Sequence, residues 1–269
     1  MKGNKRINFI CIVPFALWAA IFVITPLFII LAYGFTDDNW KFTLDNILTI
    51  TKHGYFSSLM ISIALALVCT VICLLIAYPV CLFLAEMDSD TSGFMLLLFV
   101  LPMWVNSLLT MMAWQSILEK SGIINTFLQF LGLSKLRLIN TNGAIVLGMV
   151  YVYLPYMILP IYTSLVKIDT SLKDAASDLG ADPLHVFTHV TLPLSLPGIM
   201  SGITMVFIPA LTTFVISAML GGGKVMLIGN IIDQLFTSGY DWHLGSGLSI
   251  VLLVFIVLNM LLQHAVNRS

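Results

Sequence analysis

The chain has 269 residues, of which 59% are hydrophobic and only 9% are Asp, Glu, Lys or Arg. An average soluble domain carries about 25% charged residues, and a soluble fold of this length could not hide so much apolar surface from water. The mean hydropathy of +1.02 therefore argues against a soluble enzyme. The net charge of −1 leaves no basic field for a nucleic acid.

Six uncharged apolar runs are each long enough to cross a bilayer as a helix, which takes about 20 residues. All 12 basic and all 13 acidic residues fall outside these runs. Barrel strands are shorter and alternate polar with apolar residues, so only helices fit. The sequence predicts an all-α membrane protein with one transmembrane domain over residues 1–269 and spans at approximately 9–34, 56–85, 94–118, 142–166, 192–220 and 244–266.

The predicted orientation depends on the first span. Lys2, Lys5 and Arg6 precede it, which favours a cytoplasmic N-terminus. Six spans then place the C-terminus in the cytoplasm as well, together with the polar loop 167–191 between the fourth and fifth helices. The remaining basic residues are balanced between the two sides and do not decide the orientation.

Two apolar segments, Ile123–Leu133 and Val225–Phe236, are too short to cross the membrane. We expect each to form a surface or re-entrant helix on the outer side. Three consecutive glycines at 221–223 predict a flexible turn before the second segment.

The residue pattern gives no support to a membrane enzyme or to an ion-coupled carrier. No ionisable residue lies at the middle of a span, where coupling to a proton or sodium ion usually needs one. The four cysteines lie in apolar runs, and His185 and His189 lack a third ligand. The sequence therefore predicts no catalytic residue, no bound metal and no cofactor.

The polar loop 167–191 contains residues that typically begin and end helices. The stretch Ser171–Leu179 is compatible with a helix, and Gly180 is suited to end it with a positive φ. Asp182 is a good N-cap for a second helix that has Pro183 at its first position. We therefore expect two short helices joined by a sharp turn, although a solvated connector is the ordinary alternative for a loop of this length.

The same loop resembles a known motif. It is similar to the Glu-Ala-Ala loop of ABC importer permeases. The matching residues are Asp174-Ala175-Ala176, then Gly180 after three residues, then Val190-Thr191-Leu192-Pro193 after nine more. The spacing is met in full, with Asp174 in place of Glu and Val190 in place of Ile. In that family the loop lies between the fourth and fifth of six spans, as it does in this chain.

The resemblance implies a coupling helix that inserts into a groove of an ATP-hydrolysing subunit. It further implies a multi-pass protein of the bacterial inner membrane, surrounded by lipid, that carries no nucleotide-binding motif of its own. The expected partners are a homologous second permease, two ATP-binding cassette subunits and an extracytoplasmic solute-binding protein. The residues expected to contact the ATPase are Asp174, Ala175, Ala176, Gly180, Ala181, Asp182 and Pro183.

Other segments resemble the permeases of spermidine/putrescine importers, in particular the B-type membrane subunit. They are Leu101–Leu108 (LPMWVNSL), Tyr153–Met157, the stretch from Gly221 to Asn230, and Asp241-Trp242. Those permeases usually carry an Asp just before the glycine-rich turn, where this chain has Ala218. The resemblance implies polyamine import. The alternatives are a permease for another small solute, such as thiamine, iron or an oxyanion, and a membrane receptor or scaffold without transport.

Prolines inside the predicted spans would leave backbone carbonyls without their helical donors. Such carbonyls, together with aromatic faces and neutral dipoles, could solvate an ammonium group. Tolerated kinks and interfacial aromatic side chains are the alternative explanation. The candidates for a translocation pathway are Trp104, Asn106, Ser107, Tyr156, Phe207, Thr213 and Phe214.

Overall fold

The computed structural model describes residues 14–52 and 54–266. Helices dominate this part of the chain, and its only strand-like pairing is an isolated antiparallel bridge between Thr36 and Phe42. The prediction of an all-α membrane protein is confirmed. Five helical segments are long and apolar enough to cross a membrane, namely Pro14–Gly34, Tyr55–Ala85, Asn142–Val166, Pro183–Thr212 and Trp242–Leu261. Residues 9–13 of the first predicted span lie outside the described residues.

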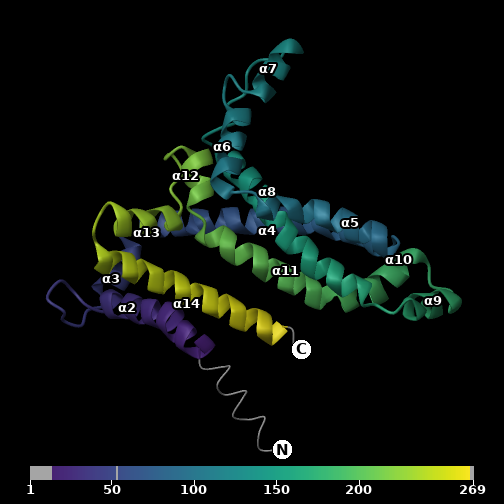
Figure 1. Ribbon diagram of the computed structural model, residues 1–269, viewed down its shortest axis with the longest axis horizontal. Helices are drawn as coiled ribbons and strands as arrows, with labels where there is room; N and C mark the ends of the chain where they lie inside the picture. The colour runs from purple at the N-terminus through teal and green to yellow at the C-terminus, as the bar shows by residue number, and fades with distance from the viewer. Residues whose placement is uncertain (1–13, 53, 267–269) are drawn as a thin grey trace, which may run out of the picture. The chain divides into compact units, whose positions relative to one another are not determined.

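The elements follow one another along the chain as labelled in Figure 1. The α-helices that follow the first turns are α2 (Thr25–Gly34), α3 (Asp45–Leu48), α4 (Tyr55–Ala85), α5 (Ser89–Val100), α6 (Ser107–Leu118), α7 (Ile123–Phe130), α8 (Asn142–Val166), α9 (Thr170–Asp178), α10 (Pro183–Val186), α11 (Leu192–Thr212), α12 (Val215–Gly221), α13 (Ile228–Thr237) and α14 (Trp242–Val266). The π-helical turns are η1 (Ala20–Ile24) and η4 (Phe187–Thr191), and the 3₁₀ turns are η2 (Thr49–Thr51) and η3 (Leu101–Trp104).

The described chain divides into two compact units. The first comprises residues up to Phe56 together with Ile231–Leu258, and the second comprises Ser57–Asn230 together with the residues from Asn259 onward. The elements considered below as functional belong to the second unit. That residues 1–269 act as a single domain remains a prediction.

The first unit is held by close contacts between its N-terminal part and α14. A Cβ on Gly34 would lie 2.3 Å from the side chain of Ile250, and one on Gly247 would lie 2.7 Å from the backbone of Asn46. Nδ1 of His243 lies 2.9 Å from the carbonyl oxygen of Tyr33. These two glycines allow backbone to approach backbone where a larger residue would separate the helices.

In the second unit, α4 lies against α8 through small side chains. The thiol of Cys81 donates to the carbonyl of Ile158 at 3.4 Å, and the thiol of Cys73 reaches the carbonyl of Val150 at 4.0 Å. The same face of α4 buries Ala66, Cys69 and Ala77 completely. Small residues allow membrane helices to pack closely where lipid provides no hydrophobic driving force between them. Cys69, Cys73 and Cys81 are thus packing residues, as the sequence indicated, and Cys11 lies outside the described residues.

The contact between α8 and α11 is closer still. A Cβ on Gly198 would lie 2.7 Å from the carbonyl oxygen of Pro160 and 2.5 Å from Cβ of Ser164. A Cβ on Gly202 would lie 2.6 Å from the sulfur of Met157. The two glycines are four residues apart, which is the spacing that lets two membrane helices meet along one stripe.

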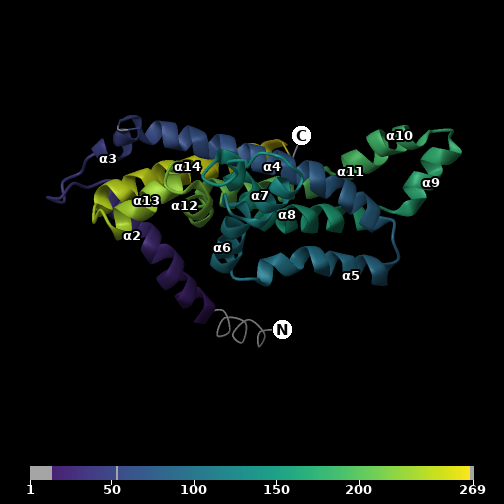
Figure 2. The same cartoon turned by 90° about the horizontal axis from the view of Figure 1, so that it is seen from above.

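The third predicted span, 94–118, is not a single straight helix, and this part of the prediction was wrong. It is divided between α5 and α6, and the two helical stretches Ser89–Trp104 and Ser107–Phe130 meet at 92°. Pro102 cannot donate to the carbonyl of Leu98, so the helix tightens into η3 and ends. Figure 2 shows α5 running alongside α8 before the chain turns sharply into α6. Counted as one broken span, this pair brings the number of candidate spans to six.

The fifth predicted span, 192–220, is not a single helix either, so this predicted helix was too long. Helix α11 ends at Thr212, and the chain is extended at Thr213 before α12 begins. The carbonyl of Phe214 accepts the backbone N–H of Ala218 and also the side-chain amide of Asn230, each at 2.9 Å, so α13 is tied to the start of α12 at this break. The short apolar segments around 123–133 and 225–236 do form short helices, α7 and α13, as expected.

The glycine contact between α8 and α11 generates a stability prediction. Gly198→Ala places a methyl group against a backbone carbonyl that cannot rotate away, so we expect destabilisation by about 1–3 kcal/mol. The matched control is Gly143→Ala in α8, because a Cβ there meets nothing closer than 3.8 Å. Thermal unfolding of the purified protein in lipid nanodiscs should show a lower Tm for Gly198→Ala and an unchanged or higher Tm for Gly143→Ala. Equal Tm values for the two variants would contradict the proposed packing.

Candidate functional site

Helices α9 and α10 form the polar loop predicted between the fourth and fifth spans. Asp169 caps α9 by accepting the backbone N–H of Ser171 at 2.9 Å. The helix ends before Gly180, whose φ of +87° is a conformation that residues with a side chain rarely adopt. The segment therefore has the geometry of two short helices and a sharp turn that the sequence predicted.

Asp182 caps the second helix of this loop. Its Oδ1 accepts the backbone N–H of His185 at 2.8 Å and lies 2.8 Å from Nδ1 of the same residue. These two interactions hold the pKa of Asp182 below its usual value, so the carboxylate is ionised at neutral pH. Pro183 occupies the first helical turn, where a missing N–H costs nothing.

The loop continues without interruption into the membrane. Pro183–Thr212 is a continuous 30-residue helical segment made of α10, η4 and α11. The wide turn η4 precedes Pro193, which has no N–H for the carbonyl of His189. Helix α10 is consequently rigidly connected to the helix that packs against α8.

The predicted ATPase-contacting residues lie together on this loop. Asp174 and Ala175 are exposed on α9, Ala176 is half-buried, and Gly180, Asp182 and Pro183 are exposed around the turn, with Ala181 half-buried between them. No hydrogen bond from the side chain of Asp174 is found within the described residues. The segment thus presents a mainly polar surface with a sharp protruding corner.

Two leucines on the same corner are exposed, and one of them, Leu179, was missed by the sequence reasoning. Leu179 is 90% exposed immediately before Gly180, and Leu184 is 67% exposed in α10. A large apolar side chain at the tip of an otherwise polar turn is a signal that the sequence itself contained. Such a side chain gains free energy when a partner protein covers its apolar surface.

A second candidate site lies at the break between α5 and α6. A cavity of about 200 Å³ opens between this break and α8. It brings together two of the predicted pathway residues, Ser107 and Tyr156, with the hydroxyl-bearing side chains of Thr110 and Tyr151. No Asp, Glu, Lys or Arg lines this cavity.

Backbone carbonyls add to the polar character of the cavity. Pro155 and Pro160 have no N–H, so the carbonyls four residues earlier lose their usual helical donor. Those carbonyls belong to Tyr151 and Tyr156, and both residues line the cavity. The cavity wall therefore supplies hydroxyl groups and aromatic rings, and two of its residues have carbonyls without a helical donor. Groups of this kind suit a cation that is not paired with a carboxylate.

The other predicted pathway residues are not all brought to this cavity. Asn106 accepts the N–H groups of Leu108 and Leu109, so its side-chain oxygen serves as the N-cap of α6. Trp104 is 74% exposed on the turn before it. Phe207 and Thr213 are buried near the end of α11, and Phe214 is partly exposed beside them. The structure thus unites Ser107 with Tyr156 and leaves the remaining candidates apart from them.

The glycine-rich turn is held by a polar network. Gly222 and Gly223 have φ values of +56° and +72°. Oδ1 of Asn230 accepts the N–H of Leu227 at 3.2 Å and the hydroxyl of Ser217. Ala218, which stands where the resembling permeases have Asp, is exposed on α12. The turn therefore forms although this chain has no carboxylate at position 218.

Comparison with known proteins identifies the family. Residues 77–269 match the family described as the inner membrane component of binding-protein-dependent transport systems. The chain belongs to this family. It is a permease subunit of an ABC-type importer and a protein of the inner membrane. The predicted function as a permease subunit and the predicted location in the inner membrane are therefore confirmed.

Individual relatives support the same assignment. The chain is 35% identical to the spermidine/putrescine transport system permease protein PotB of Salmonella typhimurium strain LT2, covering 100% of this chain and 96% of that protein. It is 36% identical to PotB of Escherichia coli strain K12, covering 93% and 94%. A bacterial alginate ABC transporter, solved in complex with an alginate-bound periplasmic protein, has the same fold with a TM-score of 0.78 at 16% identity, covering 98% and 95%.

The capping of α10 generates a prediction about the loop. Asp182→Ala removes the acceptor for the N–H of His185, whereas Asp182→Asn keeps one, since Asn caps helices as well as Asp does. We expect Asp182→Ala to lower ATP-dependent uptake by membrane vesicles and Asp182→Asn to preserve it.

The lowered pKa of Asp182 gives the accompanying pH dependence. A carboxylate whose pKa is depressed on folding stabilises the fold above its unfolded pKa, and this contribution is lost as the pH falls through the folded value. The protection factors of the α10 amides, which are the exchange rates corrected for the intrinsic slowing of exchange at low pH, should therefore fall in acid. Equal exchange and equal uptake in the Ala and Asn variants would show that the cap has no role.

Proposed function

We propose that this subunit forms half of the translocation pathway of an ATP-driven importer of polyamines such as spermidine and putrescine. The observation that carries the substrate assignment is the full-length similarity to PotB proteins, at 35–36% identity. The charge-free cavity at the break between α5 and α6 supports it chemically, because carbonyl dipoles and aromatic faces stabilise ammonium groups.

The proposed complex contains this chain as a single permease domain, a homologous second permease and two ATP-binding cassette subunits. An extracytoplasmic solute-binding protein delivers the substrate. Both termini and the loop 167–191 face the cytoplasm. ATP hydrolysis takes place in the cassette subunits, since this chain has no nucleotide-binding motif.

The coupling helix of this proposal is the α9–α10 loop. The small residues Ala175 and Ala176 permit close approach to a groove, and Gly180 permits the sharp corner. Leu179 supplies an apolar anchor at the tip. The uninterrupted segment from Pro183 to Thr212 then connects the docked loop to the membrane domain.

In the proposed pathway, Ser107 and Tyr156 contact the passing ammonium groups inside the cavity. Trp104, Asn106, Phe207, Thr213 and Phe214 remain candidates for other points along the route. A permease for a different small solute is the second candidate function. The observation that favours it is that Ala218 stands where the permeases of polyamine importers usually carry an Asp. An exposed Asp at that position would attract a polycation, and this subunit lacks it.

The function is tested by reconstituting the complete complex in liposomes and supplying labelled spermidine, putrescine, thiamine, ferric iron and phosphate in turn. We expect ATP-dependent accumulation of the polyamines and not of the other three solutes. ATP-driven uptake of another solute without polyamine uptake would select the second candidate. A complex that copurifies with no ATPase would instead support a scaffold.

A matched pair of variants tests the cavity in the same assay. Tyr156→Leu removes a ring and a hydroxyl, and since a cation–π contact contributes about 0.5–2 kcal/mol, uptake should fall roughly 2- to 30-fold. Tyr156→Phe keeps the ring and should retain most of the uptake. Unchanged polyamine kinetics in Tyr156→Leu would remove this cavity from the pathway.

A further inference from the structure

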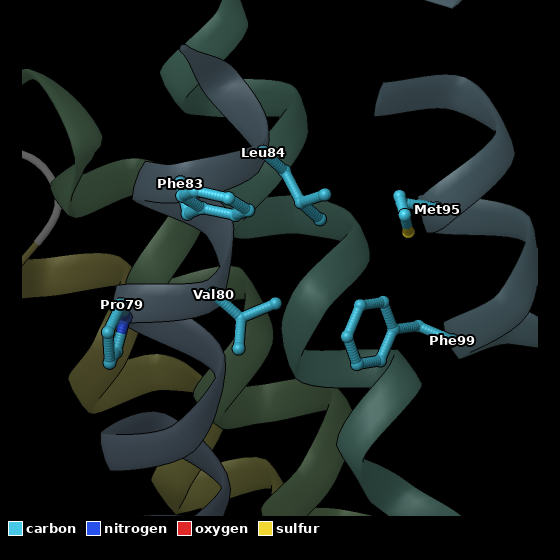
Figure 3. Close-up of a pocket in the computed structure, with 6 residues that line it drawn as sticks. All are labelled: Pro79, Val80, Phe83, Leu84, Met95 and Phe99. Atoms are coloured by element: carbon cyan, nitrogen blue, oxygen red, sulfur yellow. The ribbon is translucent and has the colours of Figure 1, made fainter. Parts of the chain in front are cut away.

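An apolar cavity separates α4 from α5 near the turn that joins them. Figure 3 shows side chains of both helices facing this space, with Pro79, Val80, Phe83 and Leu84 on α4 and Met95 and Phe99 on α5. Its volume is about 380 Å³. None of the six side chains carries a polar atom, so water placed there would find no side-chain partner. The cavity is suited to a hydrocarbon.

The turn beside the cavity is acidic. Glu86, Asp88 and Asp90 are the only charged residues between Lys52 and Glu119, and Glu86 follows the cavity residue Leu84 by two positions. All three acidic residues are exposed. The end of the α4–α5 pair nearest the cavity therefore carries only negative charge.

The charge of this turn is present at neutral pH. Oδ2 of Asp88 accepts the backbone N–H of Thr91 at 3.0 Å and its hydroxyl at 2.9 Å. These bonds hold the pKa of Asp88 below its usual value. Glu86 and Asp90 flank this ionised carboxylate in sequence, and the segment 53–118 contains no Lys or Arg.

We propose that the cavity holds an acyl chain of a phospholipid whose ammonium headgroup lies at the acidic turn. The hydrocarbon chain fits the apolar lining, and the headgroup matches the charge of Glu86, Asp88 and Asp90. A lipid with a purely anionic headgroup would meet like charge at the same place. The inference concerns this face of the second unit and does not depend on which solute the importer carries.

The dimensions favour a lipid chain over a helix of another subunit. A volume of about 380 Å³ is near the lower end of the roughly 300–1,000 Å³ found for pockets that hold one small organic molecule. A packed helix would require a long groove of small residues, as between α8 and α11. Here the opposing walls instead carry Phe83 and Phe99, which leave a short space between them.

The test uses the complete importer reconstituted in vesicles that contain equal amounts of phosphatidylethanolamine and phosphatidylglycerol. After gentle extraction, native mass spectrometry counts the lipids that stay bound. We expect retained phosphatidylethanolamine to exceed phosphatidylglycerol by about five-fold or more, the size of effect that one charge has near a membrane surface. Equal retention of the two lipids would overturn the proposal.

Two variants on the same helix locate the bound chain. Val80→Phe fills the cavity and should lower the retained phosphatidylethanolamine several-fold. Val71→Phe makes the same change at an exposed position of α4 that does not line the cavity, and it should leave retention unchanged. If Val80→Phe instead releases the second permease while lipid retention stays the same, the cavity is a subunit interface and the proposal is wrong.

Substitutions at the exposed turn test the headgroup without altering the core. Glu86→Gln combined with Asp90→Asn should reduce the preference for phosphatidylethanolamine, whereas Glu119→Gln, an acidic residue at the end of α6, should not. Because these positions are exposed, the result remains decisive if Val80→Phe fails to assemble. An unchanged preference in the double variant would contradict the headgroup assignment.

Discussion

The close approach of α11 to α8 at Gly198 and Gly202 is the contact on which the rest of the second unit depends. It brings the backbone of one helix against Pro160 and Met157 of the other, with no room for a side chain between them. Helix α11 is continuous with α10, and α8 carries one wall of the hydroxyl-lined cavity. The functional loop and the candidate pathway are consequently attached to the two members of one tightly packed pair.

This arrangement suggests how a movement at the loop reaches the cavity. A displacement of α10 moves a continuous 30-residue helical segment, and that segment cannot slide freely along α8 because the glycine contact interlocks them. A tyrosine hydroxyl adds a directional link between the two helices, since Tyr153 of α8 donates to the carbonyl of Pro209 of α11 at 3.2 Å. Tyr78 of α4 also bonds to Ser195 of α11, at 2.9 Å. We infer that α8 and α11 move as one body during transport.

The interior of the second unit contains polar groups although its membrane-spanning helices α4, α8 and α11 have no charged residues. In a bilayer each backbone polar group must find a partner within the protein. The break before α6 is repaired locally, because the side chain of Asn106 accepts the N–H groups of Leu108 and Leu109. At Tyr151 and Tyr156, two residues of the cavity wall, the prolines remove the helical donors of the carbonyls.

The loop geometry could be predicted from sequence because its signals are local. Asp182, Pro183 and Gly180 each act within a few residues, and the structure places a cap, a first helical turn and a positive φ at those positions. The apolar runs likewise predicted the helices, since exclusion of charge from hydrocarbon is a property of each segment by itself.

The two interrupted spans could not be predicted in the same way. The runs 94–118 and 192–220 are uncharged and mostly apolar throughout, and hydropathy does not reveal where a helix bends. The break after Trp104 depends on Asn106 capping a new helix, for which Pro102 gave only a partial signal. The break after Thr212 depends on Asn230, which is 16 residues from Phe214 in sequence. The cavity containing Ser107 and Tyr156 follows from these bends and was therefore not foreseen as a unit.

The claim that α8 and α11 move as one body can be measured directly by spin-label distances. Leu147→Cys on α8 and Leu194→Cys on α11 place labels on exposed positions of the two helices. Leu194 lies beside Ser164, 17 residues along α8 from Leu147, so the labels are about 25 Å apart. Cys69, Cys73 and Cys81 are buried, and Cys11 is replaced by Ser. Pulsed electron paramagnetic resonance on the reconstituted importer would compare the nucleotide-free and ATP-trapped states. The account predicts the same label–label distance in both states, and a change larger than the roughly 1–2 Å typical of small helix shifts would contradict it.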